Sequence, residues 1–165
     1  MKLKKLGNSE LIVSSFCLGT MTFGEQTPEK QAHMQIDHCI NSGINFLDTA
    51  EMYPTCPIRK STQGDTERII GNWIKKSPSK RDKVVLATKI IGKGFENIRN
   101  GKPISPEGIK FAVNESLKRL KTDYIDLYQL HWPNRGSYHF RQHWDYDPSK
   151  QDTKNIINEI PLIVD

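Results

Sequence analysis

The sequence predicts one α/β domain, in which a small hairpin precedes four βα units around a parallel sheet. Short apolar segments of strand length alternate along the chain with segments of amphipathic-helix pattern. Most of these strands are too apolar to have one face in water, which is typical of a parallel sheet covered by helices. The 165 residues are 36% hydrophobic and 26% charged, which suits one globular domain and excludes disorder and collagen.

The N-terminal segment predicts the hairpin and the first strand of the sheet. Residues 3–6 and 11–13 resemble strands, and the polar residues 7–10 between them suit a turn. Residues 15–18 are again mostly apolar, and the chain then meets Gly19. We therefore expect a third strand that ends abruptly at this glycine.

The first helix is expected to run to about Asn41. Thr27 can cap its N-terminus, Pro28 suits the first helical position, and Glu29 favours the positive end of the helix dipole. Gly43 closes the helix.

The second βα unit combines a short strand with a helix that starts late. Residues 44–48 are mostly apolar and end in Asp48, and a long polar loop then leads to Asp65. A helix is expected to follow, because apolar residues recur at helical spacing until Ser77 and Pro78 stop it. The residues of this apolar face are Ile69, Ile70, Trp73 and Ile74.

The third unit repeats the same order of signals. Residues 84–89 form an apolar segment that ends in the amine of Lys89, which predicts a buried strand. Ser105, Pro106 and Glu107 then repeat the capping residue, proline and acidic residue that began the first helix. The apolar face of this third helix is expected to comprise Phe111, Val113, Leu117 and Leu120.

The fourth unit begins with the strand 124–131, which ends in the imidazole of His131. Residues 132–151 are predicted to form a long polar and aromatic loop. A last helix is expected over residues 152–164, where Pro161 would break or kink the pattern. No repeat or low-complexity linker divides the chain, so the sequence predicts one domain.

Charge and composition disfavour several classes of function. The net charge is +5, but the basic residues are interspersed with acidic ones, without the dense stripe that nucleic-acid binding requires. An anionic small ligand suits this mild excess. No apolar run approaches the roughly 20 residues that cross a bilayer, so no membrane partner is expected. The three cysteines lack a CxxC spacing and no signal peptide is evident, so we expect a cytoplasmic protein.

Three polar side chains end three successive predicted strands. Asp48, Lys89 and His131 are 41 and 42 residues apart, which is one βαβ period each. Because the carboxyl ends of parallel strands meet on one side of a sheet, these groups are expected to converge where such folds bind ligands. Tyr53 lies five residues beyond Asp48, within reach of the same place.

These four side chains can transfer a proton to a carbonyl oxygen. We expect the ammonium of Lys89 to lower the pKa of the Tyr53 phenol, and Asp48 to keep that ammonium charged and oriented. Tyr53 would then protonate a developing alkoxide as a general acid, while His131 donates a hydrogen bond to the same oxygen. Carbonyl reduction also needs a hydride, which no side chain supplies, so a nicotinamide cofactor is implied.

Simpler roles for these residues compete with catalysis. A single Asp, Lys or His at a strand end is more often a loop anchor or a surface group, and it is the joint order of the four that favours catalysis. A metal site is not expected, because the histidines lack an HExxH motif or cysteine support. The companions of His131 are His33, His38, His139 and His143.

Five segments of the chain have the character of family motifs: Leu18 to Gly24, Gly43 to Tyr53, Thr88-Lys89, Ser116 to Leu120 and Asp123 to Pro133. They resemble successive motifs of the aldo-keto reductases, and the match extends along nearly the whole chain. On residues 50–54, 64–67 and 70–73, the sequence is most similar to the bacterial NADP(H)-dependent Tas-type members of that family.

The resemblance implies a fold and an extent. Members of this family form a TIM (β/α)₈ barrel opened by an N-terminal hairpin, so the chain is expected to be the N-terminal half of such a barrel, the hairpin plus four βα units. Residues 1–165 would then be a partial reductase domain, truncated after about the fourth unit. The strands that hold most of the cofactor have no counterpart here, so the isolated chain is expected to be inactive or nearly so.

The resemblance also implies roles for single residues. Asp48, Tyr53, Lys89 and His131 match the catalytic tetrad of the family, with Tyr53 as the general acid. Trp132 opens a loop that borders the substrate, and the cofactor is implied to be NADPH. The residues expected near the cofactor are Gly19, Thr20, Met21 and Asp48.

Two functions of different classes follow. The first is an oxidoreductase that reduces aldehydes or ketones with NADPH, a small-molecule carbonyl being its substrate. The alternative is a non-catalytic, cofactor-binding regulatory subunit of the same fold.

Overall fold

A computed structural model of the chain describes residues 1–134 and 147–150. Two compact units are present: the first comprises residues 1–89 and 114–129, and the second residues 90–113 and 130–165. The helix predicted over 152–164 and most of the loop predicted over 132–151 lie outside the described residues. His139 and His143 also lie outside them.

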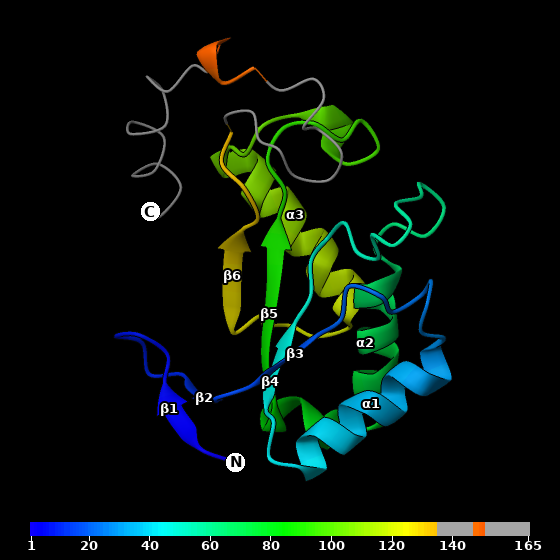
Figure 1. Cartoon of the computed structure of the whole chain (residues 1–165), viewed down its shortest axis with the longest axis vertical. Coiled ribbons are helices and arrows are strands. Elements are labelled where there is room, and N and C mark those ends of the chain that lie inside the picture. The colour runs from blue at the N-terminus through cyan, green and yellow to red at the C-terminus, as the bar shows by residue number, and fades with distance from the viewer. Residues whose placement is uncertain (135–146, 151–165) are drawn as a thin grey trace. The chain divides into compact units, whose positions relative to one another are not determined.

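The hairpin forms as predicted. Strand β1 (Leu3–Lys5) pairs antiparallel with β2 (Ile12–Ser14), and Figure 1 shows both in blue at the start of the chain. Asn45 ties this hairpin to the sheet: its side chain accepts a hydrogen bond from the Ser14 amide at 2.7 Å and donates one to the Ile12 carbonyl at 3.0 Å. The hairpin is thereby fixed to the amino-terminal end of strand β4 (Phe46–Asp48).

The four remaining strands form one sheet, in the order of the sequence. They are β3 (Cys17–Gly19), β4 (Phe46–Asp48), β5 (Val85–Ile90) and β6 (Leu127–Leu130). The pairs β3–β4 and β4–β5 are parallel, and Asp48 has Gly19 and Ala87 as its register partners. The predicted α/β fold with a parallel sheet is confirmed. Parallel pairing places the ends of β3 and β4 on the same side, as the site prediction requires.

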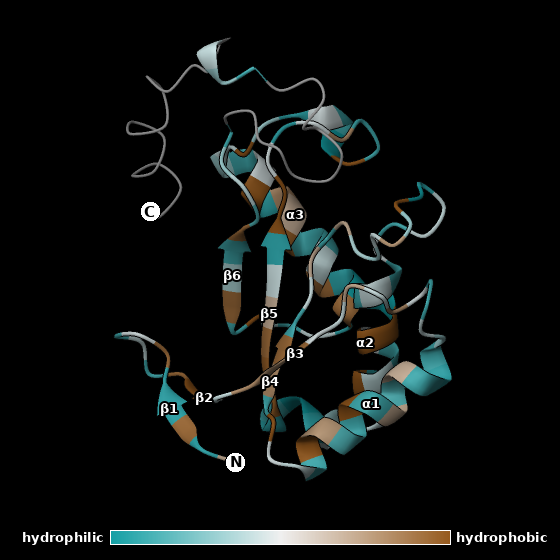
Figure 2. Ribbon diagram, in the orientation of Figure 1, coloured by the Kyte–Doolittle hydropathy of each residue, from teal (hydrophilic) through white to brown (hydrophobic). Residues whose placement is uncertain are grey.

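Helices follow the strands at the predicted places. They are α1 (Glu29–Asn41), α2 (Asp65–Lys76) and α3 (Pro106–Leu120), with short 3₁₀ turns at Pro78–Lys83, Arg99–Gly101 and Pro148–Lys150. In Figure 2, hydrophobic and hydrophilic colours alternate along α1, as in an amphipathic helix. The hydrophobic core of the first unit includes Ile36, Leu47, Ile70, Leu86 and Leu120, all fully buried.

Two local predictions about the helices are wrong. Thr27 does not cap α1: Pro28 occupies that position, and the Thr27 hydroxyl lies 3.1 Å from the Thr22 hydroxyl within the preceding turn. Phe111 does not belong to the buried face of α3, because 57% of its surface is exposed. The fully or nearly fully buried residues of that helix follow a spacing of four instead, at Ala112, Ser116 and Leu120.

The capping signal of α3 is confirmed. The Gly108 amide donates a hydrogen bond to the Ser105 hydroxyl at 3.0 Å, so this serine satisfies one of the amides that a helix start leaves unpaired. In the same second unit, Asn134 exchanges two hydrogen bonds with the backbone of Ile104, at 2.6 and 2.8 Å. These bonds hold the segment after β6 against the segment before α3.

Candidate active site

An ion pair between Asp48 and Lys89 forms the centre of the candidate site. The Lys89 ammonium lies 2.6 Å from Oδ2 of Asp48, and it also donates to the Thr49 carbonyl at 2.6 Å. Only 9% of the Lys89 surface is exposed. The two acceptors take two of the three N–H groups of the ammonium and fix its direction. The structure thus brings together two of the predicted catalytic residues.

Gln129 on β6 completes the surroundings of this carboxylate. Its amide nitrogen donates to Oδ1 of Asp48 at 3.1 Å, so the two carboxylate oxygens have different donors. The sequence prediction missed Gln129. The signal was present, because residues two apart in a strand share one face, and Gln129 precedes His131 by two.

Tyr53 lies beside the ion pair, in the loop that follows β4. The Lys89 nitrogen is 5.1 Å from the centre of the Tyr53 ring. The backbone of Tyr53 is held on both sides, because its amide donates to the Ala50 carbonyl at 3.1 Å and its carbonyl accepts from the Gly64 amide at 2.9 Å. Only 7% of the residue is exposed.

Burial and, second to it, the negative charge of Asp48 together raise the pKa of Tyr53 to about 12. The expectation that Lys89 would lower this pKa is therefore wrong for this structure. The physical reason is that burial penalises the phenolate, and that the negative charge of Asp48 disfavours a second negative charge beside it. Tyr53 is consequently a protonated phenol at neutral pH.

The residues at the end of β3 surround Asp48 from the other side. Both the amide and the hydroxyl of Thr20 donate to the Asp48 carbonyl, at 3.1 and 2.8 Å, and Thr20 is fully buried. Thr20 therefore fixes the backbone of Asp48. Gly19 faces open space, since no heavy atom lies within 4 Å of the position that a Cβ would take. Met21 is 37% exposed.

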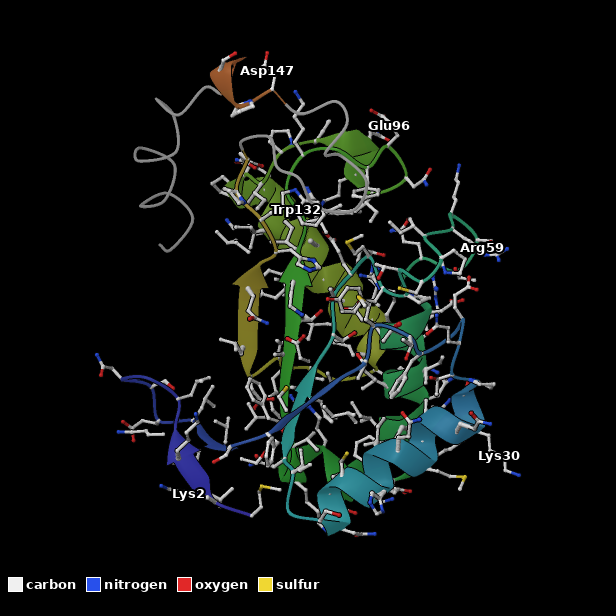
Figure 3. The ribbon with its side chains drawn as sticks, in the orientation of Figure 1. Lys2, Lys30, Arg59, Glu96, Trp132 and Asp147 are labelled. Carbon is white, nitrogen blue, oxygen red and sulfur yellow. The ribbon has the colours of Figure 1, made fainter. Side chains whose placement is uncertain are left out.

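His131 and Trp132 belong to the second unit. The His131 amide donates to the Ile90 carbonyl at 2.8 Å, and its ring centre lies 5.1 Å from that of Trp132. Trp132 is nearly buried, with its indole N–H 3.3 Å from the Lys93 carbonyl; Figure 3 labels it beyond the end of β6. The structure thus groups Asp48, Tyr53 and Lys89 in the first unit, and His131 with Trp132 in the second.

The described part of the chain holds neither a cluster of metal ligands nor a membrane-spanning helix. Within residues 1–134 and 147–150, no group of three histidine, cysteine or acidic side chains is placed to hold a metal ion. The helices of the same residues are all too short or too polar to span a bilayer.

A parallel sheet with a lysine–aspartate pair and a buried tyrosine at its carboxyl edge agrees with the family suggested by the sequence motifs. Residues 15–159 match the sequence model of the aldo/keto reductase family. The chain belongs to this aldo/keto reductase family. The family resemblance predicted from the motifs is therefore confirmed.

Individual relatives of this aldo/keto reductase agree with the assignment. It is 48% identical to Protein tas of Escherichia coli K12 over 138 residues, which cover 82% of this chain and 39% of the relative. It is 36% identical to a probable voltage-gated potassium channel subunit beta of Arabidopsis thaliana over 138 residues, 83% of this chain and 39% of that protein. The first of these bears out the predicted similarity to Tas-type reductases.

A solved structure extends the comparison to the fold. The aldo-keto reductase AKR11C1 from Bacillus halodurans, in its holo form, is 38% identical and superposes with a TM-score of 0.63 over 79% of this chain and 40% of that one. This likeness confirms the predicted fold class, a part of a TIM barrel. The chain spans about 40% of the length of these relatives.

Proposed function

We propose that the protein containing these residues reduces aldehydes or ketones to alcohols with NADPH, and that Tyr53 is the general acid. The observation that carries the proposal is the pair of Asp48 and Lys89, 2.6 Å apart, beside the buried phenol of Tyr53 in a chain of the aldo/keto reductase family. A carbonyl accepting a hydride needs a proton donor and a nearby positive charge, and these residues supply both.

The cofactor is expected at the end of β3. Gly19 has open space where a Cβ would stand, and Met21, two residues later, is exposed, so this end of β3 is accessible beside Asp48. We propose that Gly19, Thr20, Met21 and Asp48 border the nicotinamide end of NADPH. When bound, this cofactor supplies the hydride that no side chain can.

The proton transfer follows from the positions of the side chains. Tyr53 is protonated at neutral pH because its pKa is about 12, so it can donate to the alkoxide that forms on the substrate. Lys89, held by Asp48 and the Thr49 carbonyl, places a positive charge close to the oxygen on which negative charge develops in the substrate. We assign His131 a hydrogen bond to the same substrate oxygen, and Trp132 a place beside the substrate.

The same proposal states how much of the barrel these residues form. We propose that residues 1–165 are the N-terminal half of a larger barrel, a partial reductase domain of a cytoplasmic enzyme. Under this proposal the 165-residue chain alone turns over little or no substrate, because further strands contribute to cofactor binding. The DNA that follows codon 165 tests this directly: an in-frame continuation supports it, and an immediate stop codon contradicts it.

Activity is tested with protein made from the complete reading frame that contains these residues. NADPH and 4-nitrobenzaldehyde are mixed with it, and both the loss of NADPH and the alcohol product are measured. The expected result is one alcohol molecule formed for each NADPH consumed. Lys89→Met should lower the rate of this reaction by about 10² to 10³. Lys75→Met is the matched control, because Lys75 is exposed on α2. Equal rates for Lys89→Met and this control would contradict the proposal.

The second candidate function is a cofactor-binding regulatory subunit. The similarity to a probable potassium channel subunit beta of Arabidopsis thaliana favours it. It predicts that the complete protein binds NADPH but shows negligible turnover with every carbonyl tested. The presence of Asp48, Tyr53, Lys89 and His131 together favours the reductase, because binding alone does not require a proton donor.

A further inference from the structure

We propose that Gln129 is a positioning residue, whose amide holds the Asp48 carboxylate in the orientation that aims the Lys89 ammonium. This inference rests on the proposed function, because it names a further residue of the same site. Its starting observation is the hydrogen bond of 3.1 Å between Nε2 of Gln129 and Oδ1 of Asp48.

The bond spans a whole strand. The sheet order places β5 between β4, which carries Asp48, and β6, which carries Gln129. Ala87 of β5 is the register partner of Asp48 and is fully buried. Because alternate residues of a strand share a face, the methyl group of Ala87 lies on the same face as Lys89. This small side chain leaves room for Asp48 and Gln129 to meet across β5.

The Asp48 carboxylate is consequently fixed at both oxygens. Lys89 donates to Oδ2 at 2.6 Å, and Gln129 donates to Oδ1 at 3.1 Å. With only one donor, the carboxylate could rotate about its Cβ–Cγ bond and carry the lysine nitrogen with it. The backbone of Asp48 is already fixed by Thr20, so Gln129 restrains the degree of freedom that remains.

The chemistry of the amide suits this role. A carboxylate accepts only, so the group facing it must be a donor, and the amide nitrogen of glutamine is an uncharged donor. It leaves the charge of the pair unchanged, whereas a second ammonium would compete with Lys89 for the same carboxylate. Removing the amide should therefore affect orientation without removing any charge from the site.

The bond itself is tested by NMR, without reference to turnover. Protein from the complete reading frame is labelled with ¹⁵N in its glutamine side chains, and the Gln129 signal is assigned by its loss in Gln129→Met. We expect this signal to shift in Asp48→Asn, while the Gln35 signal, from the exposed face of α1, stays in place. An unmoved Gln129 signal would overturn the proposal even if the protein is an active reductase.

Kinetics test the consequence for the reaction. Gln129→Met should lower kcat by about tenfold or more, as loss of one hydrogen bond to a charged group allows, with KM changed by less than about twofold. Gln35→Met is the control and should retain the wild-type kcat. Because Gln129 acts through Asp48, adding Gln129→Met to Asp48→Asn should lower kcat no further. If kcat of the double variant fell by the product of the two single-variant losses, the proposal would be overturned.

A second substitution keeps the proposal testable if Gln129→Met folds poorly. Gln129→Asn keeps the amide but shortens its reach by one methylene, so it should lose the bond and the same part of kcat. A wild-type kcat in Gln129→Asn would also overturn the proposal. Absence of turnover in the wild-type protein would instead refute the proposed function, and the NMR measurement would still decide whether Gln129 holds Asp48.

Discussion

Glu67 of α2 is completely buried, and its carboxylate lies 2.6 Å from Nε of Arg119 at the end of α3. Its second oxygen accepts a hydrogen bond from the Thr88 hydroxyl at 2.6 Å. Thr88 immediately precedes Lys89 on β5. One buried carboxylate therefore connects two helices to the strand that carries the central lysine.

Removing one member of this buried pair should strongly destabilise the protein. Arg119→Met leaves the Glu67 charge buried without its partner, so the free energy of unfolding should fall by about 3–5 kcal/mol. Glu115→Gln is the control, since that residue pairs with Lys118 on the surface, and its effect should stay below about 1 kcal/mol. Urea denaturation followed by circular dichroism measures both, and equal losses would contradict the account of the buried pair.

Gly71 is required for the contact between α2 and α3. A Cβ added there would lie 2.2 Å from the Arg119 carbonyl oxygen and 2.7 Å from the Leu120 carbonyl carbon, which are backbone atoms. Gly71→Ala should therefore destabilise the protein by about 1–3 kcal/mol, although alanine is the better helix former. Lys75→Ala on the exposed side of the same helix should leave the stability nearly unchanged. Thermal unfolding measures both variants, and a lower melting temperature for Lys75→Ala than for Gly71→Ala would disprove this packing.

Asn45 should control the attachment of the hairpin. In Asn45→Ala the Ser14 amide loses its acceptor, so its hydrogen exchange should become faster while amides of β5 remain protected. Asn41→Ala, at the end of α1, provides the comparison. Unchanged exchange at Ser14 would show that the hairpin is held by other contacts.

The alkaline titration of Tyr53 should reveal its burial. Its pKa is raised from 10.0 to about 12, so its phenolate absorbance, isolated as the difference between wild type and Tyr53→Phe, should appear near pH 12. Because the folded protein holds this proton more tightly than the unfolded chain, the resulting stability is complete below pH 10 and is lost as pH rises towards 12. Asp48→Asn should lower this pKa; titration of Tyr53 near 10 would contradict the geometry.

The sequence predicted the fold because local signals and tertiary structure agree along most of it. The helical spacing of Ile69, Ile70, Trp73 and Ile74 was confirmed by their burial in α2. Phe111 was misassigned because its hydrophobicity, considered alone, does not show which side of α3 meets the sheet. Thr27 was misassigned because its hydroxyl had a competing partner in Thr22, which the capping pattern cannot show.

The candidate site was predicted only in part. Asp48 and Lys89 were predicted to lie together because parallel strands end on the same side of a sheet, and the structure confirms their contact. The direction of the Tyr53 pKa was wrong, because burial depends on packing that no motif displays. Gln129 was missed because its partner lies 81 residues earlier and across an intervening strand.

The most direct test of the central claim compares wild type with Tyr53→Phe, both from the complete reading frame. Hydride transfer from NADPH to 4-nitrobenzaldehyde is measured in a single turnover, together with NADPH affinity by fluorescence. The account predicts that the substitution slows the transfer by about 10² to 10⁴, as loss of a general acid does, while NADPH still binds. A Tyr53→Phe protein that reduces the aldehyde at the wild-type rate would contradict it.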